Sequence, residues 1–209
     1  MPAKVVCISR ALGAEGAEVG LIVADRLGYR LVDEEIVAEA AAKGQVDPDL
    51  VADAEQRRSL ARRILDELLW TSGATVTPEF SPAEFSSEPH RELIIGAIRE
   101  TAERGQAVIV AHAASHALAG RPGVLRVLVT ASPEVRARRL AAIEGVDESR
   151  GLKLVRESDA ARAAYFKEFY GLADELPTQY DLVVNTDALS PEEVAGLVVA
   201  ATGFGLQSS

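Results

Sequence analysis

The fold is decided near the start of the chain, by the stretch Val5-Val6-Cys7-Ile8-Ser9-Arg10-Ala11-Leu12-Gly13-Ala14-Glu15-Gly16-Ala17-Glu18-Val19-Gly20. Val5 to Ile8 is a short apolar run, typical of a central parallel strand covered on both faces. The small residues at 13–16 make a turn that lets a ligand approach the backbone. Helical spacing begins at Val19, and Gly28 is placed as a C-cap. The stretch therefore predicts a strand, a small loop and a helix, a geometry that binds anions and usually phosphate.

The loop departs from the common phosphate-binding motif G-x-x-x-x-G-K-[ST]. Gly16 stands at the lysine position, and Ala17 and Glu18 fill the positions around the hydroxyl. Arg10 is the cation closest to the loop, while Glu15 and Glu18 place two carboxylates where a phosphate would lie. The motif leaves two interpretations open: a nucleotide site, or the strand–turn–helix opening of an α/β protein that holds no ligand.

Length, charge and cysteine content restrict the classes of function. The chain has 209 residues, of which 48% are hydrophobic, and a formal net charge of −10. These values predict one domain with an ample core and argue against a nucleic acid or an anionic membrane as partner. Cys7 has no second cysteine to pair with and is expected in the core. No zinc pattern can be assembled, so no metal site is predicted from the side chains. We expect a cytoplasmic protein, because there is no signal peptide and no apolar run of ~18 residues.

Strands and helices alternate along the chain, which predicts a parallel sheet with helices on both faces. Strands are expected at 5–8, 107–111, 124–130 and 182–185, with a short strand or extended link at 29–32. Helices are expected at 19–27, 33–43, 92–104, 132–140, 152–170 and 190–203, with one long or two broken helices at 49–70. Residues 71–90 read as a loop, and 145–151 as a gap between two helices. Ligands of such sheets bind beyond the carboxyl ends of the strands. The side chains expected to converge there are Arg10, His112, Ala131 and Asn185.

Further motifs follow in a fixed order: Ile8-Ser9-Arg10 with Gly13-x-x-Gly16-x-Glu18-Val19-Gly20, then Leu27 to Val37, Gly105 to Val110, Val124 to Ser132, Asp159 to Gly171, and Tyr180 to Thr186. In this order, and over nearly the whole chain, they resemble the cytidylate kinase-like family. The segment from Asp159 is similar to the family's D-x-x-R-x-x-Y-Y helix, and that from Tyr180 to its Y-D-L-x-[LI]-N-[ST] strand.

The resemblance implies an α/β fold of the P-loop kinase kind, with a parallel five-stranded sheet sandwiched by helices. It implies a single kinase-like domain with its core in 1–32, 91–144 and 180–209. A helical insertion that binds the nucleoside monophosphate maps to 33–90, and a lid with its following helix to 145–179. The implied reaction transfers the γ-phosphoryl group of ATP to a nucleoside monophosphate such as CMP. ATP and Mg²⁺ are then the cofactors, and a small-molecule nucleotide is the partner.

Phosphoryl transfer depends on backbone N–H donors, cations and a metal ion. We expect the catalytic cations to be Arg10, Arg139, Arg156 and Arg162. The ATP-binding residues are expected to be Ser9, Arg10, Gly13, Ala14, Glu15, Gly16, Ala17, Glu18 and Asn185. The acceptor nucleotide is expected to lie against Asp33, His112 and Tyr165.

Four of these residues have a structural alternative. His112 could simply be a hydrogen-bonding residue at the end of its strand. Arg162 could form an ion pair with Asp159 at i−3, and Asp33 could be the N-cap of the helix that follows it. Asn185 could simply belong to a turn after its strand. The segment 49–70 could likewise form the surface of a homodimer or pack within the chain.

Two departures from the family pattern fall at the expected reaction centre. The family's G-S-G-G becomes Gly13-Ala14-Glu15-Gly16, and its G-R-G-A becomes Ala111-His112-Ala113-Ala114. The loop gains a carboxylate, Glu15. The segment after the central strand loses an arginine suited to the acceptor phosphate, for which His112 is a pH-dependent substitute. The alternative to an active kinase is therefore a catalytically impaired pseudokinase that acts as a nucleotide-binding or protein-interaction module.

Overall fold

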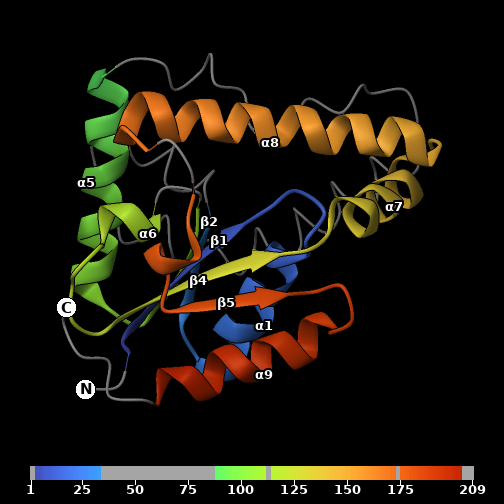
Figure 1. Cartoon of the computed structure of the whole chain (residues 1–209). Helices are drawn as coiled ribbons and strands as arrows, with labels where there is room; N and C mark the ends of the chain where they lie inside the picture. The colour runs from blue at the N-terminus through green and yellow to red at the C-terminus, as the bar shows by residue number, and fades with distance from the viewer. Residues whose placement is uncertain (1–2, 34–87, 112–113, 173–174, 204–209) are drawn as a thin grey trace.

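A computed structural model describes residues 3–33, 88–111, 114–172 and 175–203. Its centre is a five-stranded sheet in the order β2-β3-β1-β4-β5 (Figure 1). The strands are β1 (Val5–Arg10), β2 (Arg30–Asp33), β3 (Ala107–Val110), β4 (Val124–Thr130) and β5 (Leu182–Asn185). All neighbouring strands are parallel, so the predicted parallel five-stranded sheet is confirmed and its carboxyl ends share one edge.

The helices follow the predicted alternation. They are α1 (Gly16–Leu27), α5 (Glu88–Arg104), α6 (Ala114–Ala117), α7 (Pro133–Glu144), α8 (Glu148–Tyr170) and α9 (Pro191–Thr202), with a 3₁₀ turn η2 (Pro177–Gln179). Their boundaries carry the expected signals. Gly28 ends α1 with φ of 64°, Ser132 caps α7 ahead of a proline, and Ser190 forms a capping box with Glu193.

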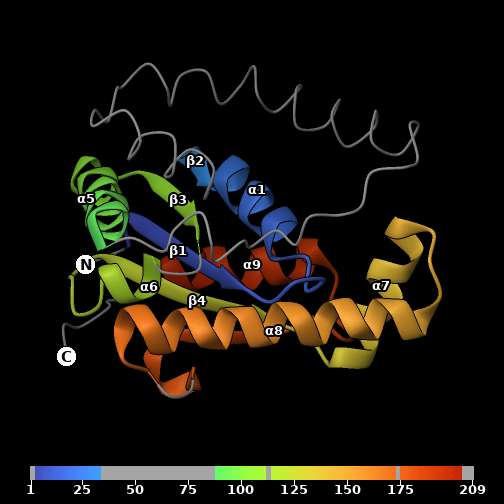
Figure 2. The ribbon, with the colours of Figure 1, turned by 90° about the horizontal axis from the view of Figure 1, so that it is seen from above.

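Two apolar layers hold the sheet between its helices (Figures 1 and 2). On one face, Val23 of α1 and Val198 of α9 pack against β1 residues such as Ile8. On the other face, Ile98 of α5 packs with Cys7. Burial raises the pKa of the Cys7 thiol to about 12, so this cysteine is the inert core residue that the sequence predicts. In the described part of the chain, no helix is long and apolar enough to span a membrane.

Helix α8 differs from its prediction at its start. It begins at Glu148, with the Asp147 side chain accepting a hydrogen bond from the N–H of Arg150 at 2.8 Å, so the predicted gap at 145–151 is only a short turn. Gly151 lies inside the helix. A Cβ at this position would come within 2.4 Å of the carbonyl oxygen of Ala137 on α7, so the close approach of the two helices requires glycine here. The glycine that suggested a helix break serves instead for close packing between two helices.

Helix α5 begins at Glu88, before the expected start at residue 92 and inside the expected loop 71–90. The predicted insertion 33–90 falls largely on residues 34–87, outside the described residues. The same holds for the possible homodimer surface at 49–70 and for His112. These expectations stay predictions.

Candidate functional site

The loop between β1 and α1 has the tight geometry that its small residues predict. Gly13 has φ of 77° and Glu15, the N-cap of α1, has φ of 61°. Both values lie in the left-handed region, which costs an ordinary L-residue about 1–2 kcal/mol. A Cβ on Gly16 would lie 2.5 Å from the Cβ of Arg10. Gly16 is therefore required by the way the loop folds back over the end of β1.

The carbonyl edge of this loop is held by hydrogen bonds. Every carbonyl oxygen from Arg10 to Glu15 accepts one, from the backbone N–H groups of Ala14 and Val19 in two cases. Side chains supply the rest: Arg162 Nη1 to Arg10 O at 2.9 Å, Arg136 Nη1 to Leu12 O at 3.3 Å, Arg139 Nη1 to Gly13 O at 3.3 Å, and Thr186 Oγ1 to Ala14 O at 3.2 Å. Three guanidinium groups thus hold three of the loop's carbonyls.

The amide edge of the same loop has the opposite character. Within the described residues, the N–H groups of Leu12, Gly13 and residues 15–18 have no protein acceptor. The N–H groups of residues 16–18 are the unpaired donors of the first turn of α1, where the helix dipole places partial positive charge. Unpaired donors gathered at a helix start form a site for an anion such as phosphate.

Glu15 is paired with a cation of α7. Its carboxylate lies 3.0 Å from Arg139 Nη2. Arg139 also donates to Thr186, at 2.9 Å to the hydroxyl and 2.7 Å to the carbonyl oxygen. The Glu15–Arg139 ion pair offsets the negative charge of the acidic residue that distinguishes this loop, and it ties the loop to the segment after β5.

Arg162 is buried, with 9% of its surface exposed, and is held at the end of β1. Its guanidinium contacts Glu175 through Nε at 2.8 Å and Nη2 at 2.6 Å, and Nη2 also donates to Ser9 Oγ at 2.9 Å. Tyr180 donates its hydroxyl to Glu175. Burial, followed by the nearby Glu175 charge, raises the pKa of the Tyr180 phenol. Ser9 is fully buried in this network.

The predicted structural alternative for Arg162, an ion pair with Asp159, is wrong. Asp159 does not pair with Arg162 but accepts two hydrogen bonds from Arg136, at 2.9 Å and 2.6 Å. The reason is tertiary: α7 lies beside α8 and brings Arg136 to Asp159, while Arg162 faces the end of β1. Spacing along one helix cannot reveal either partner.

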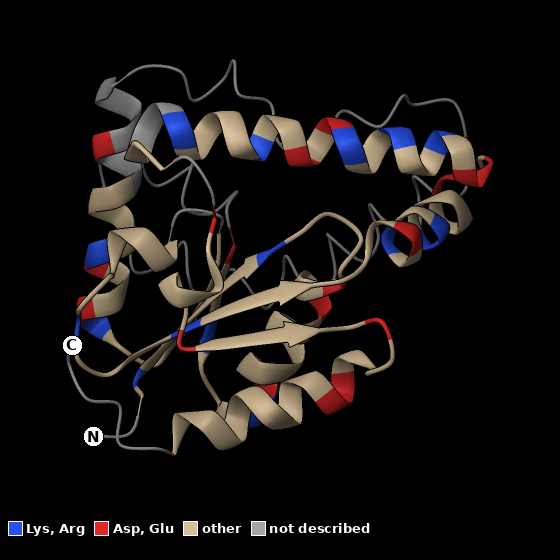
Figure 3. Ribbon diagram, in the orientation of Figure 1, with Lys and Arg blue, Asp and Glu red and all other residues tan. Residues whose placement is uncertain are grey.

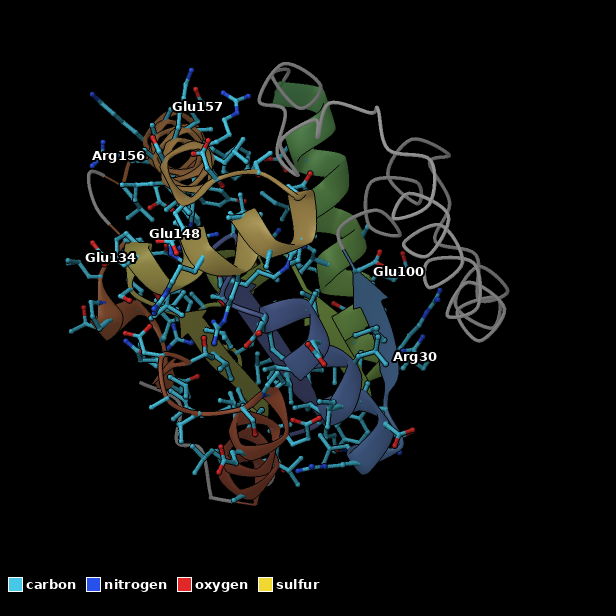
Figure 4. All side chains as sticks on the ribbon, turned by 90° about the vertical axis from the view of Figure 1, so that its right-hand side faces the viewer. Arg30, Glu100, Glu134, Glu148, Arg156 and Glu157 are labelled. Atoms are coloured by element: carbon cyan, nitrogen blue, oxygen red, sulfur yellow. The ribbon has the colours of Figure 1, made fainter. Side chains whose placement is uncertain are left out.

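The remaining predicted cations are placed differently. Arg10 is half-buried at the end of β1, beside the loop. Arg156 is exposed on the outer side of α8, as is its neighbour Glu157 (Figure 4). Residues of both charges are distributed along α8, which lies above the sheet (Figure 3). Of the four predicted cations, Arg10, Arg139 and Arg162 come together around the loop, and Arg156 does not.

The residues predicted for the nucleosides occupy distinct places. Asp33 ends β2 and lies opposite Val110 of β3, at the carboxyl edge of the sheet. Tyr165 is buried in an aromatic cluster with Phe166 and Tyr170. Asn185 is exposed at the end of β5, and its Oδ1 accepts from the N–H of Asp187 at 2.7 Å, which is the turn that its structural alternative describes. The roles of all three in ligand binding stay predictions.

Four residues of this site were not among the predicted ones: Arg136, Asp159, Glu175 and Thr186. Two of them carried a signal in the sequence. Arg136 is three positions before Arg139, so both lie on one side of α7. Thr186 directly follows Asn185 at the carboxyl end of a strand, where ligand sites of parallel sheets lie. Glu175 lies beyond α8, and no local pattern connects it with Arg162.

Comparisons with known proteins agree with this architecture. The model of the cytidylate kinase-like family matches residues 5–188. Cytidylate kinase of Archaeoglobus fulgidus is 27% identical over 201 residues, covering 94% of this chain and 93% of that protein. Cytidylate kinases of Methanocorpusculum labreanum and Methanopyrus kandleri are 35% and 30% identical over 37% and 49% of this chain. The matches span 44% and 58% of those two relatives, about half of their length.

Solved structures resemble the fold at low sequence identity. An uncharacterized protein from Eubacterium ventriosum has a TM-score of 0.67 at 17% identity, with 95% of this chain and 97% of that chain covered. Shikimate kinase from Bacteroides thetaiotaomicron has a TM-score of 0.54 at 16% identity, with 96% and 98% covered. These structures support the kinase-like α/β fold alone. Because the family model spans most of the sequence and the sheet, loop and helices follow in the expected order, the chain belongs to the cytidylate kinase-like family.

Proposed function

We propose that this protein transfers the γ-phosphoryl group of ATP to a nucleoside monophosphate, with CMP as the first candidate. One observation carries the proposal. The loop after β1 has every carbonyl from Arg10 to Glu15 hydrogen-bonded, and its N–H groups at the start of α1 have no protein acceptor among the residues that the structure describes. Positioned N–H donors are what a transferring phosphoryl group requires.

The residues fit a bound Mg²⁺–ATP in their chemistry. The unpaired N–H groups of the loop would hold phosphate oxygens, and Arg10 beside them would contribute positive charge. Magnesium binds mainly through phosphates, waters and one or two carboxylates. The described carboxylates at this edge of the sheet include Glu15 in the loop, Glu18 in the first turn of α1 and Asp33 at the end of β2. When bound, the metal would neutralise charge that develops on the transferring group.

The described contacts divide the proposed cations into two kinds. Arg139 and Arg162 donate to loop carbonyls and are paired with Glu15 and Glu175, so they would support the shape of the phosphate site. Arg10, at the end of β1 beside the loop, would act on the phosphates directly, and a catalytic role for Arg156, which is exposed away from the loop, stays a prediction. Asp33, Tyr165 and His112 would contact the acceptor.

A coupled assay of ADP formation tests the proposal. Purified protein is incubated with Mg²⁺–ATP and, in turn, CMP, dCMP, UMP and AMP. Turnover above the acceptor-free rate with a pyrimidine monophosphate is the expected result. Absence of turnover with all four acceptors, in a protein that still binds Mg²⁺–ATP by calorimetry, would overturn the kinase and favour the nucleotide-binding module.

Substitution of Glu15 by glycine tests the loop itself. Glu15→Gly removes a carboxylate near the phosphate site, relieves the positive φ and frees Arg139 from its carboxylate. The Kd for Mg²⁺–ATP should therefore fall several-fold, since a partly exposed ion pair is worth up to about 1 kcal/mol. Glu134→Gln, an exposed carboxylate at the start of α7 (Figure 4), is the matched control and should leave Kd unchanged. An unaltered Kd in Glu15→Gly would contradict a loop that faces phosphate.

A further inference from the structure

A pattern of arginine–carboxylate pairs lies behind the phosphate loop. Each guanidinium that holds a loop carbonyl is also paired with one carboxylate: Arg162 with Glu175, Arg136 with Asp159, and Arg139 with Glu15. The carboxylates come from the segment after α8, from α8 itself and from the loop. A carboxylate on each arginine fixes the direction of its planar, multi-donor group.

Arg136 links α7 to the loop through its backbone as well as through its side chain. A Cβ built on Gly13 would lie 3.0 Å from the backbone oxygen of Arg136 and 3.2 Å from its Cα. The loop backbone therefore packs directly on the backbone of α7 at this residue. The Arg136 side chain then reaches past Gly13 to donate to Leu12 O at 3.3 Å.

The same side chain connects the loop to α8. Arg136 is 4% exposed, and its two terminal nitrogens bind both oxygens of Asp159, at 2.9 Å and 2.6 Å. Its Nε has no acceptor among the described residues. An unpaired buried donor costs free energy. The Arg136 side chain therefore takes this position at a cost to its own hydrogen bonding. The contacts it does make run from α8 through α7 to the loop.

We propose that Arg136 is a positioning residue of the phosphate loop: by holding Leu12 O and Asp159 together, it turns the loop's N–H groups to one side and couples the loop to α8. The inference rests on the proposed function, because the proposed function supplies the phosphate that those N–H groups would bind. Arg136 touches no reacting group in this scheme and acts only through the loop.

Hydrogen exchange of the full chain without ligand tests the positioning. In Arg136→Gln, the hydrogen-bonded amides of Ala11, Ala14 and Val19 should exchange faster, on the order of tenfold, because the loop opens locally. Peptides from β3 and β4 should exchange as in the wild type. The matched control is Arg138→Gln, an exposed arginine on the same helix, which should change neither. Arg136→Lys keeps the charge but lacks the fork and should not restore protection.

Two results would overturn the inference. One is wild-type exchange at the amides of Ala11, Ala14 and Val19 in Arg136→Gln. The other is faster exchange spread evenly over all peptides, which indicates a merely structural residue. Asp159→Asn should give a smaller, loop-confined effect, and it replaces Arg136→Gln as the test if that variant does not fold.

Calorimetry with pyrophosphate and with Mg²⁺–ATP then separates this inference from the proposed function. A weaker Kd for both ligands in Arg136→Gln, with unchanged Kd in Arg138→Gln, is the expected result. If the wild type binds neither ligand, the proposed function fails while the exchange result still decides whether Arg136 positions the loop.

Discussion

The two halves of α8 carry the same kinds of side chain and differ in what surrounds them. The half from Asp159 onward, which we call the inner half, is tied to the loop after β1: Arg162 holds the end of β1, and Phe166 is buried beneath it. The half from Glu148, which we call the outer half, packs on α7 through Gly151 and presents Arg156 to solvent (Figure 4). The sequence predicts the same catalytic role for both arginines, and the structure separates them. Burial and tertiary partners, and not residue type, decide whether an arginine on this helix is fixed.

The largest effect on stability is expected for Arg162→Gln. The substitution leaves Glu175 inside the protein without its cation, and breaking a buried pair from one side costs about 3–5 kcal/mol. Urea denaturation measures the free energy of unfolding. Arg162→Gln combined with Glu175→Gln should recover part of the loss, because the second change removes the unpaired charge. A loss in the single variant of less than about 1 kcal/mol would contradict a fixed inner half.

A smaller effect is expected in the outer half, for Gly151→Ala. The added Cβ would meet the backbone oxygen of Ala137 at 2.4 Å. Overpacking costs about 1–3 kcal/mol, which exceeds the gain of about 1 kcal/mol from replacing glycine by alanine in a helix. Gly96→Ala on α5 is the control, since no described atom lies within 4 Å of its Cβ, and it should stabilise the protein. Equal effects of the two substitutions would show that α7 and α8 do not pack closely.

A pH-dependent effect is expected at the inner half, through His116. Its ring contacts Phe166 and Tyr170 with centroid distances of 5.0 Å and 5.4 Å. Burial lowers the pKa of His116, against the opposing charge of Glu175 and together with Arg162 and Arg126. The folded state therefore favours the neutral ring. This contribution is present above the unfolded pKa of about 6.5 and is lost as the pH falls through the lowered folded value.

His116→Phe isolates that contribution. Thermal unfolding of both proteins is followed from about pH 7.5 to about pH 5.5. This range extends to both sides of the ordinary histidine pKa of about 6.5. The wild type should lose more stability over this range than the variant. Parallel curves would mean that the ring is solvated and that its lowered pKa plays no part in stability.

The smallest change in stability is expected for Arg156→Gln. An exposed surface substitution usually changes the free energy of unfolding by less than about 0.5 kcal/mol. If Arg156 is one of the proposed cations, turnover should nevertheless fall by at least about tenfold, with the KM for the acceptor little changed. Lys153→Gln, also exposed on the outer half, is the control for loss of a surface charge. Equal turnover in the two variants would remove Arg156 from the proposed reaction.

Much of the fold was predictable because it rests on local signals. The apolar run in β1, the small residues of the loop and the caps at Gly28, Ser132 and Ser190 each act within a few residues of chain. The helix that begins at Glu148 was placed too late, because Gly151 is a local helix breaker whose packing against α7 no local pattern shows.

The sequence by itself determined the parallel sheet, the phosphate loop at its edge and the family. Apolar periodicity and motif order are properties of the chain. Only the tertiary structure decided what the charged groups do. In the folded protein, ion pairs form between Glu15 and Arg139, between Asp159 and Arg136, and between Glu175 and Arg162. The physical reason is that the sequence offers each arginine several carboxylates as possible partners. The packing of α7, α8 and β1 then decides, by distance and burial, which of them forms the ion pair.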